Sequence, residues 1–181
     1  MIVSIVAFTN VACANILTGG RGSLVTNEGQ LSNMMIEQIV AAISAQDSDT
    51  MRQLFSDLAI GQDDNFESSM KILFDVFNNK TLIEEDDSLL WSSHEEVCEG
   101  KKSKAVTSLF VFNAEDEKYK FYIINYAKDT IDPQNAGLFC LYVWPILSDD
   151  DTGSPADSWE DLSPGIHILD NDFNDLPMKH N

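Results

Sequence analysis

The stretch AAISAQDSDTMRQLFSDLAIG, residues 41–61, decides the fold because two helical patterns meet in it at a polar break. Asp47 and Ser48 are good N-cap residues, since a side-chain oxygen there accepts the unpaired N–H groups of a new helix. Gly61 suits the end of that second helix. We therefore expect a first helix over about residues 30–45 and a tight elbow into a second one. Apolar positions at helical spacing are Leu31, Met35, Ile39 and Ala42, then Met51, Leu54, Phe55 and Leu58.

Downstream of the elbow the apolar pattern changes from a helical period to alternation. A third helix is expected between Asp63 and Phe77, and a weak acidic strand at residues 81–91. Residues 104–130 read as two strands around the turn at 113–117, and residues 136–146 as another strand. Helices followed by strands indicate an α+β fold, with N-terminal helices packed on a curved antiparallel β-sheet. The second face of that sheet then needs cover from a partner chain, as in a homodimer, or from the C-terminal segment.

Length and charge exclude several classes of function. The chain has 181 residues, 44% of them hydrophobic, which is enough for one packed domain. Its formal net charge of −19 repels phosphate backbones, so we expect no nucleic-acid partner. The same charge repels anionic lipid headgroups, which leaves an anchor as the route to a membrane. Solubility explains the charge without a specific cationic partner.

The N-terminus looks like an export leader. Residues 1–12 are apolar but too short to span a bilayer. Val11-Ala12-Cys13 resembles the end of a bacterial lipobox, with Asn10 where that motif usually has Leu, and it makes Cys13 the lipidation candidate. Residues 12–14 also fit ordinary secretory cleavage. A basic n-region is missing, and a frayed N-terminus without a targeting role is the third interpretation. We expect an extracytoplasmic protein.

The expected organisation has three parts. Residues 1–28 form a signal-like or lipoprotein-like leader and a flexible tether, residues 29–170 a single α+β domain, and residues 171–181 an acidic tail. Two cysteines, Cys98 and Cys140, remain beside Cys13. They either pair in a disulfide or are unrelated thiols, with Cys140 buried in a strand.

No residue pattern points to a catalytic or metal centre. None of the three histidines falls in an expected core strand, and His94 is placed in an acidic loop at residues 92–100. His94 and Cys98 alone are too few ligands for zinc. The tail from Asp170 resembles the start of a calcium loop but has Asp175 where that loop needs glycine. We therefore expect no catalytic residues, no metal and no cofactor.

The element order and the elbow resemble the nuclear transport factor 2-like superfamily, a cystatin-like cone of helices on a curved sheet. A narrower resemblance rests on NYAKDTIDPQNAGLFCLYV, residues 125–143, and SWEDLSPGIHIL, residues 158–169. These stretches are similar to a bacterial family described as domain of unknown function 5104, whose members are mostly predicted lipoproteins of Firmicutes. The resemblance covers about residues 30–170. It implies the fold and export, and it implies no activity.

A cone of this kind usually has a pocket between the sheet and the helices. The residues that could line such a pocket, or equally pack in a core or at a dimer face, are Trp91, Tyr122, Tyr126, Asp129, Tyr142 and Trp144. Asp129 could act as a base or cap a turn. The sequence thus predicts an exported, non-enzymatic binding or interaction domain for an unidentified small ligand or protein, with a lipid anchor if Cys13 is lipidated. The alternative is a small-molecule enzyme of the isomerase or hydratase type.

Overall fold

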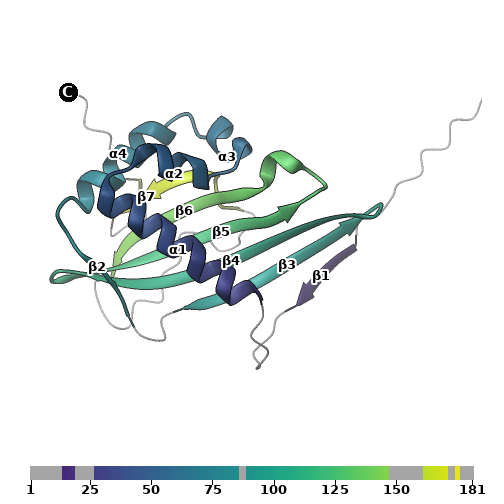
Figure 1. Cartoon of the computed structure of the whole chain (residues 1–181), viewed down its shortest axis with the longest axis horizontal. Helices are drawn as coiled ribbons and strands as arrows, with labels where there is room; N and C mark the ends of the chain where they lie inside the picture. Colours follow the sequence, from purple (N-terminus) through teal and green to yellow (C-terminus); the bar gives the residue numbers. More distant parts are fainter. Residues whose placement is uncertain (1–13, 19–26, 86–88, 147–160, 171–173, 176–181) are drawn as a thin grey trace, which may run out of the picture.

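The computed structural model describes residues 14–18, 27–85, 89–146, 161–170 and 174–175. One short strand comes first, four helices follow between residues 27 and 76, and the other strands come after them (Figure 1). The helices are α1 (Asn27–Ala45), α2 (Ser48–Leu54), α3 (Asp57–Gln62) and α4 (Phe66–Val76). The α+β class is therefore confirmed.

The predicted elbow between α1 and α2 is confirmed, and its cause is local. The Asp47 carboxylate caps α2 by accepting the Thr50 backbone N–H at 3.0 Å, as an N-cap residue should. Gln46, between the two helices, has a positive φ of 52°, which turns the chain sharply.

The prediction of one continuous second helix through Gly61 is wrong. The chain leaves α2 after Leu54, and Phe55 forms a β-bridge with Leu138 of the sheet. Ser56 then donates its backbone N–H to the Leu138 carbonyl at 3.0 Å and caps α3 through its hydroxyl. Because the partner lies more than eighty positions away in the sequence, helical periodicity alone could not show the break.

The strands form one seven-stranded sheet, mostly antiparallel, within the described residues. Its order is β1-β3-β4-β5-β6-β7, and β2 pairs with the end of β4. The strands are β1 (Ala14–Thr18), β2 (Leu82–Glu84), β3 (Leu90–Cys98), β4 (Lys101–Ala114), β5 (Glu117–Asp129), β6 (Gly137–Ile146) and β7 (Gly165–Ile168). The predicted β4–β5 hairpin and the strand at 136–146 are confirmed.

Three expectations for the sheet need correction. Residues 92–98, expected in an acidic loop, are most of β3, because β1 and β4 pair with its two sides and satisfy its backbone groups. Residues 14–18, expected in the leader and tether, form β1. The last strand, β7, runs parallel to β6, so the sheet is not wholly antiparallel.

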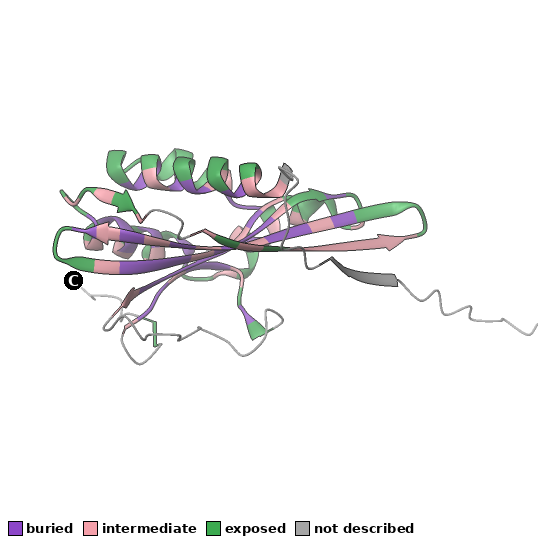
Figure 2. Cartoon of the chain, turned by 90° about the horizontal axis from the view of Figure 1, so that it is seen from below, coloured by how far each residue is buried: buried purple, intermediate pink, exposed green. Residues whose placement is uncertain are grey.

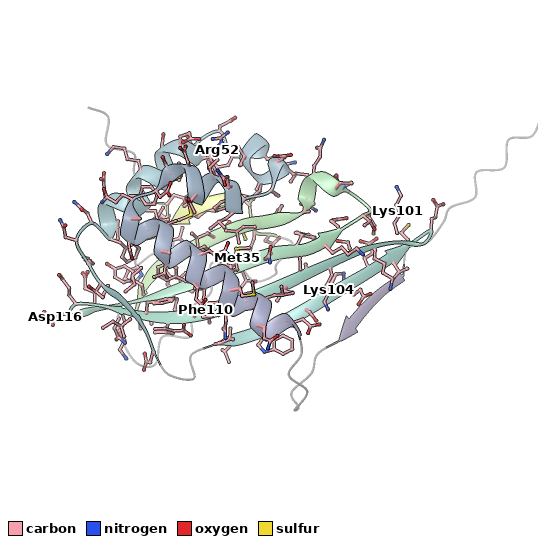
Figure 3. All side chains as sticks on the ribbon, viewed as in Figure 1. Met35, Arg52, Lys101, Lys104, Phe110 and Asp116 are labelled. Carbon is pink, nitrogen blue, oxygen red and sulfur yellow. The ribbon has the colours of Figure 1, made fainter. Side chains whose placement is uncertain are left out.

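The helices cover one face of the sheet, here called the inner face (Figure 2). Phe110 of β4 lies beneath α1, where Met35 also packs against the core (Figure 3). Along β5, Tyr119, Phe121 and Ile123 point to this face, as alternation requires. The other face of the sheet, here called the outer face, carries the residues that alternate with these along each strand.

Candidate functional site

The space between the helices and the inner face is a packed core. Aromatic rings meet edge to face there, with centroids 4.9 Å apart for Phe112 and Phe121 and for Phe77 and Tyr119. Helix residues such as Ile39 and Met51 fill the rest, and both are 0% exposed. Apart from the phenol of Tyr119, the described side chains therefore fill the place where a cone pocket would lie with apolar groups.

Four of the aromatic candidates lie together on the outer face. The β5–β6 register sets Tyr122 opposite Tyr142 and Lys120 opposite Trp144. Tyr126 lies further along β5, on the same face. The grouping follows from the alternation of side chains along a strand. The four aromatic residues point to the outer face, and the residues next to them in sequence point to the inner face. We call this group the outer-face cluster: Ala105, Leu109, Tyr122, Ile124, Tyr126, Phe139, Cys140, Tyr142, Trp144, Leu162 and Leu169.

The C-terminal segment covers one part of the outer-face cluster. The Tyr142 hydroxyl accepts the backbone N–H of Ser163 at 2.9 Å, and its ring stacks on His167 with centroids 4.3 Å apart. Leu162 and Leu169 are buried against the same cluster. Of the two covers expected for this face, the C-terminal segment is thus present.

Another part of the outer-face cluster is only half-buried. Leu109, Tyr122, Tyr126 and Phe139 are intermediate in exposure, and the rings of Tyr126 and Phe139 meet edge to face at 5.9 Å. We call these four side chains the open aromatic patch. It borders Trp144, whose ring lies 5.7 Å from the Lys120 ammonium. The patch therefore offers apolar surface and two phenol hydroxyls to a ligand.

Trp91 does not join the open aromatic patch. It lies on β3 opposite Ser108, whose hydroxyl hydrogen-bonds Ser32 of α1 at 2.6 Å. A Cβ atom at Gly29 of α1 would lie 3.6 Å from the Trp91 indole nitrogen, so this side chain packs near the start of α1.

Asp129 is buried at the end of β5 and holds the following turn. Its carboxylate accepts the backbone N–H groups of Ile131 at 2.9 Å and Asp132 at 2.8 Å. It also accepts the Ser103 hydroxyl at 2.9 Å and lies 3.5 Å from the Asn135 amide nitrogen. These contacts match the turn-capping interpretation of this residue, since they occupy both carboxylate oxygens.

Burial controls the acid–base behaviour of the outer-face cluster. It raises the pKa of Tyr122 and of Tyr142 to about 12, with a smaller contribution from Cys140. Burial, and then the nearby Asp129 carboxylate, also raise the pKa of Tyr126. Burial raises the pKa of the Cys140 thiol to about 12, which makes it a poor nucleophile. The cluster thus stays neutral at physiological pH.

We predict that an alkaline absorbance titration of the folded protein shows Tyr122 and Tyr142 ionising near pH 12. Because folding raises these pKa values, their contribution to stability is complete below the unfolded value of about 10 and is lost as pH rises toward 12. The urea-unfolded chain is the reference, with all its phenols near 10. A native titration that coincides with this reference contradicts the burial of the cluster.

The structure decides between the two alternatives for Cys98 and Cys140, which were a shared disulfide or two unrelated thiols. Cys140 is a free thiol buried in β6, as the second alternative has it, so a disulfide between Cys98 and Cys140 is wrong. Cys98 lies at the end of β3, with β4 and β5 between it and β6. The lipidation candidate Cys13 and most of the acidic tail lie outside the described residues.

The chain was compared with known protein families, curated proteins and solved structures. A protein-family model described as "Domain of unknown function (DUF5104)" matches residues 38–148. No curated protein and no solved structure matches the chain. Among the helices described, none is both long and apolar enough to cross a membrane. Across the same described residues, no three His, Cys, Asp or Glu side chains gather as metal ligands.

Proposed function

The chain belongs to the family described as domain of unknown function DUF5104, and we propose that it is an exported binding domain with its site on the open aromatic patch. The family description names no activity, so the proposal is argued from this chain's own residues. The observation that carries it is the half-buried group of Leu109, Tyr122, Tyr126 and Phe139 on the face away from the helices.

The patch suits an apolar ligand with one or two hydrogen-bonding groups. Apolar surface next to a few fixed polar groups is the usual composition of small-molecule sites. The phenols of Tyr122 and Tyr126 keep their protons at physiological pH, so both remain hydrogen-bond donors. The side chains of the patch carry no charge, so the ligand needs no charge of its own to pair with them. A neutral or weakly cationic molecule also approaches an acidic protein more readily than an anion does.

The enzymatic alternative has weaker support. Isomerases and hydratases of the cone type place an acid–base pair in the hollow under the helices. In this chain Phe110, Phe121 and Leu141 occupy that hollow, each 0% exposed. The buried Asp129 lies at the far end of β5, with one oxygen engaged by the turn and the other by the Ser103 hydroxyl of β4. Binding on the outer face needs none of this machinery.

Two finer assignments accompany the proposal. Membership of the nuclear transport factor 2-like superfamily is supported by helices α1–α4 over one face of a mostly antiparallel sheet. Export is supported by the apolar leader at residues 1–12. Lipidation of Cys13 is the lipoprotein form of this export, and secretory cleavage at residues 12–14 is its alternative.

The test uses Nile red, a neutral apolar dye that fluoresces when it leaves water. We expect Tyr122→Ser to weaken dye binding about tenfold, because it removes an aromatic ring from the patch. The matched control is Leu90→Ser, which removes another exposed apolar side chain, 64% exposed, from β3. Equal losses in the two variants, or no loss in Tyr122→Ser, would contradict the proposed site.

A second copy of the chain is the rival occupant of the patch. Sedimentation velocity at rising concentration separates the two cases. A monomer that binds dye supports the ligand site, whereas a dimer that Tyr122→Ser dissociates shows that the patch is a homodimer interface instead.

A further inference from the structure

Two carboxylates border one end of the open aromatic patch. In the ladder of β3, β4 and β5, Glu96 lies opposite Ser103, and Ser103 lies opposite Asp129. The next row on the same face sets Ala105 opposite Tyr126 of the patch. Because residues opposite each other in a ladder share a face of the sheet, both carboxylates belong to the outer face, beside Tyr126. We call Glu96 and Asp129 the acidic border.

The Tyr126 hydroxyl lies within the electrostatic reach of the acidic border. Burial is the main cause that raises the pKa of Tyr126, and the Asp129 and then the Glu96 carboxylates add to it. A nearby carboxylate acts in this direction because a phenolate would place a second negative charge beside the first. This end of the patch therefore has a negative potential, which favours a cation.

The acidic border is not neutralised by neighbouring lysines. The two lysines that flank Ser103 in β4 are engaged on the inner face. Lys102 pairs with Glu95 of β3 at 3.7 Å, and Lys104 pairs with Glu28 near the start of α1 (Figure 3). Within the part of the chain that the structure describes, neither carboxylate of the acidic border forms an ion pair.

The aromatic rings beside the acidic border also suit a cation. The faces of phenol and phenyl rings carry negative charge density and attract an ammonium group. Tyr126 and Phe139 are both half-buried, so their rings are partly shielded from water and still accessible. Glu96 is half-buried as well, whereas Asp129 is only 7% exposed. Glu96 is therefore the carboxylate that a ligand can touch, and Asp129 acts on it through its charge.

We propose that the open aromatic patch binds a small organic ammonium, whose apolar body lies on the patch and whose charged nitrogen lies between Tyr126 and Glu96. The inference rests on the proposed function and adds the charge of the ligand to it. A small molecule fits better than a protein, because the patch has four side chains and a protein interface takes about 20–30 residues from each partner. The net charge of −19 attracts the same ligand from a distance.

The test compares three probes with the same phenylbutyl body as competitors of Nile red on the full chain. At pH 8, 4-phenylbutylamine is a cation, 4-phenylbutan-1-ol is neutral and 4-phenylbutyrate is an anion. We expect the amine to bind about tenfold more tightly than the alcohol, and the carboxylate to bind most weakly. Equal binding of the amine and the alcohol would overturn the ammonium and leave the ligand site standing. A wild-type chain that binds no Nile red would instead remove the proposed function itself.

A matched pair of variants separates the contact from the charge of the whole chain. Glu96→Gln and Glu95→Gln each remove one negative charge from neighbouring positions of β3 that face opposite sides of the sheet. Glu96→Gln should weaken binding of the amine about fivefold, and Glu95→Gln should leave it unchanged. Glu96→Asp keeps the charge and should keep most of the preference for the amine. Equal losses in the two Gln variants would mean that net charge alone attracts the amine, and would refute the contact with Glu96.

Discussion

Gly165→Ala should destabilise the protein by about 3–5 kcal/mol, because both the backbone and the neighbouring carboxylate oppose a side chain there. Gly165 has φ +106°, a conformation that L-residues rarely adopt. A Cβ atom at this position would lie 2.1 Å from Oδ2 of Asp63. That oxygen accepts the Ile166 backbone N–H at 3.3 Å, and Oδ1 accepts the N–H of Asn65 at 2.9 Å. The methyl group would therefore displace the carboxylate that joins β7 to the start of α4.

Urea denaturation measures this loss, and two controls separate its causes. Gly100→Ala introduces the same methyl group at φ +79° with nothing within 4 Å, so it should cost only about 1 kcal/mol of backbone strain. Combining Gly165→Ala with Asp63→Ala removes the carboxylate from the collision and leaves only the Asp63 Cβ contact, at 2.7 Å, so the double variant should lose less than the sum of the single losses. Full additivity in this cycle, or equal losses for the two glycine variants, would show that the collision is not the cause.

The fold was predictable from sequence where its determinants are local. The side chain of Asp47 caps α2 by accepting an N–H only three positions further along the chain. The elbow could therefore be predicted from neighbouring residues alone. The polar strand β3 was missed, because its residues are mostly half-exposed and acquire strand structure by pairing with β1 and β4. The break at Phe55 was missed for a similar reason, since its partner Leu138 lies far away in the sequence.

The sequence named two residues of the open aromatic patch, Tyr122 and Tyr126, but it named neither Leu109 nor Phe139 and it did not place the patch on the outer face. Alternation groups Tyr122 with Tyr126, and Tyr142 with Trp144, whichever way the strands face. It does not say which face the helices cover, and the pocket expected under them is instead filled by neighbours such as Phe121 and Val143. His167, which stacks on Tyr142, had only the alternation of residues 165–168 as a signal.

Phe121→Ala should cost about 3–5 kcal/mol, the range for truncating a fully buried aromatic ring. Phe121 is 0% exposed at the centre of β5 and has no polar atom whose loss would complicate the comparison. Its ring lies 4.9 Å from Phe112 and 5.6 Å from Phe77, so it connects the sheet to the residue that ends α4. Truncation leaves a cavity that rigid β-strands on both sides cannot close.

The expected loss is read from the urea midpoint, with the slope of the transition unchanged. Ile83→Ala is the matched control, because it truncates a large apolar side chain that is 61% exposed on β2 and should change stability by no more than about 0.5 kcal/mol. Dye binding on the open aromatic patch should survive in Phe121→Ala below its unfolding transition, since the ring faces away from that patch. If Phe121→Ala were as stable as Ile83→Ala, the helices would not pack on this face of the sheet, and the space beneath them would again be available for a ligand.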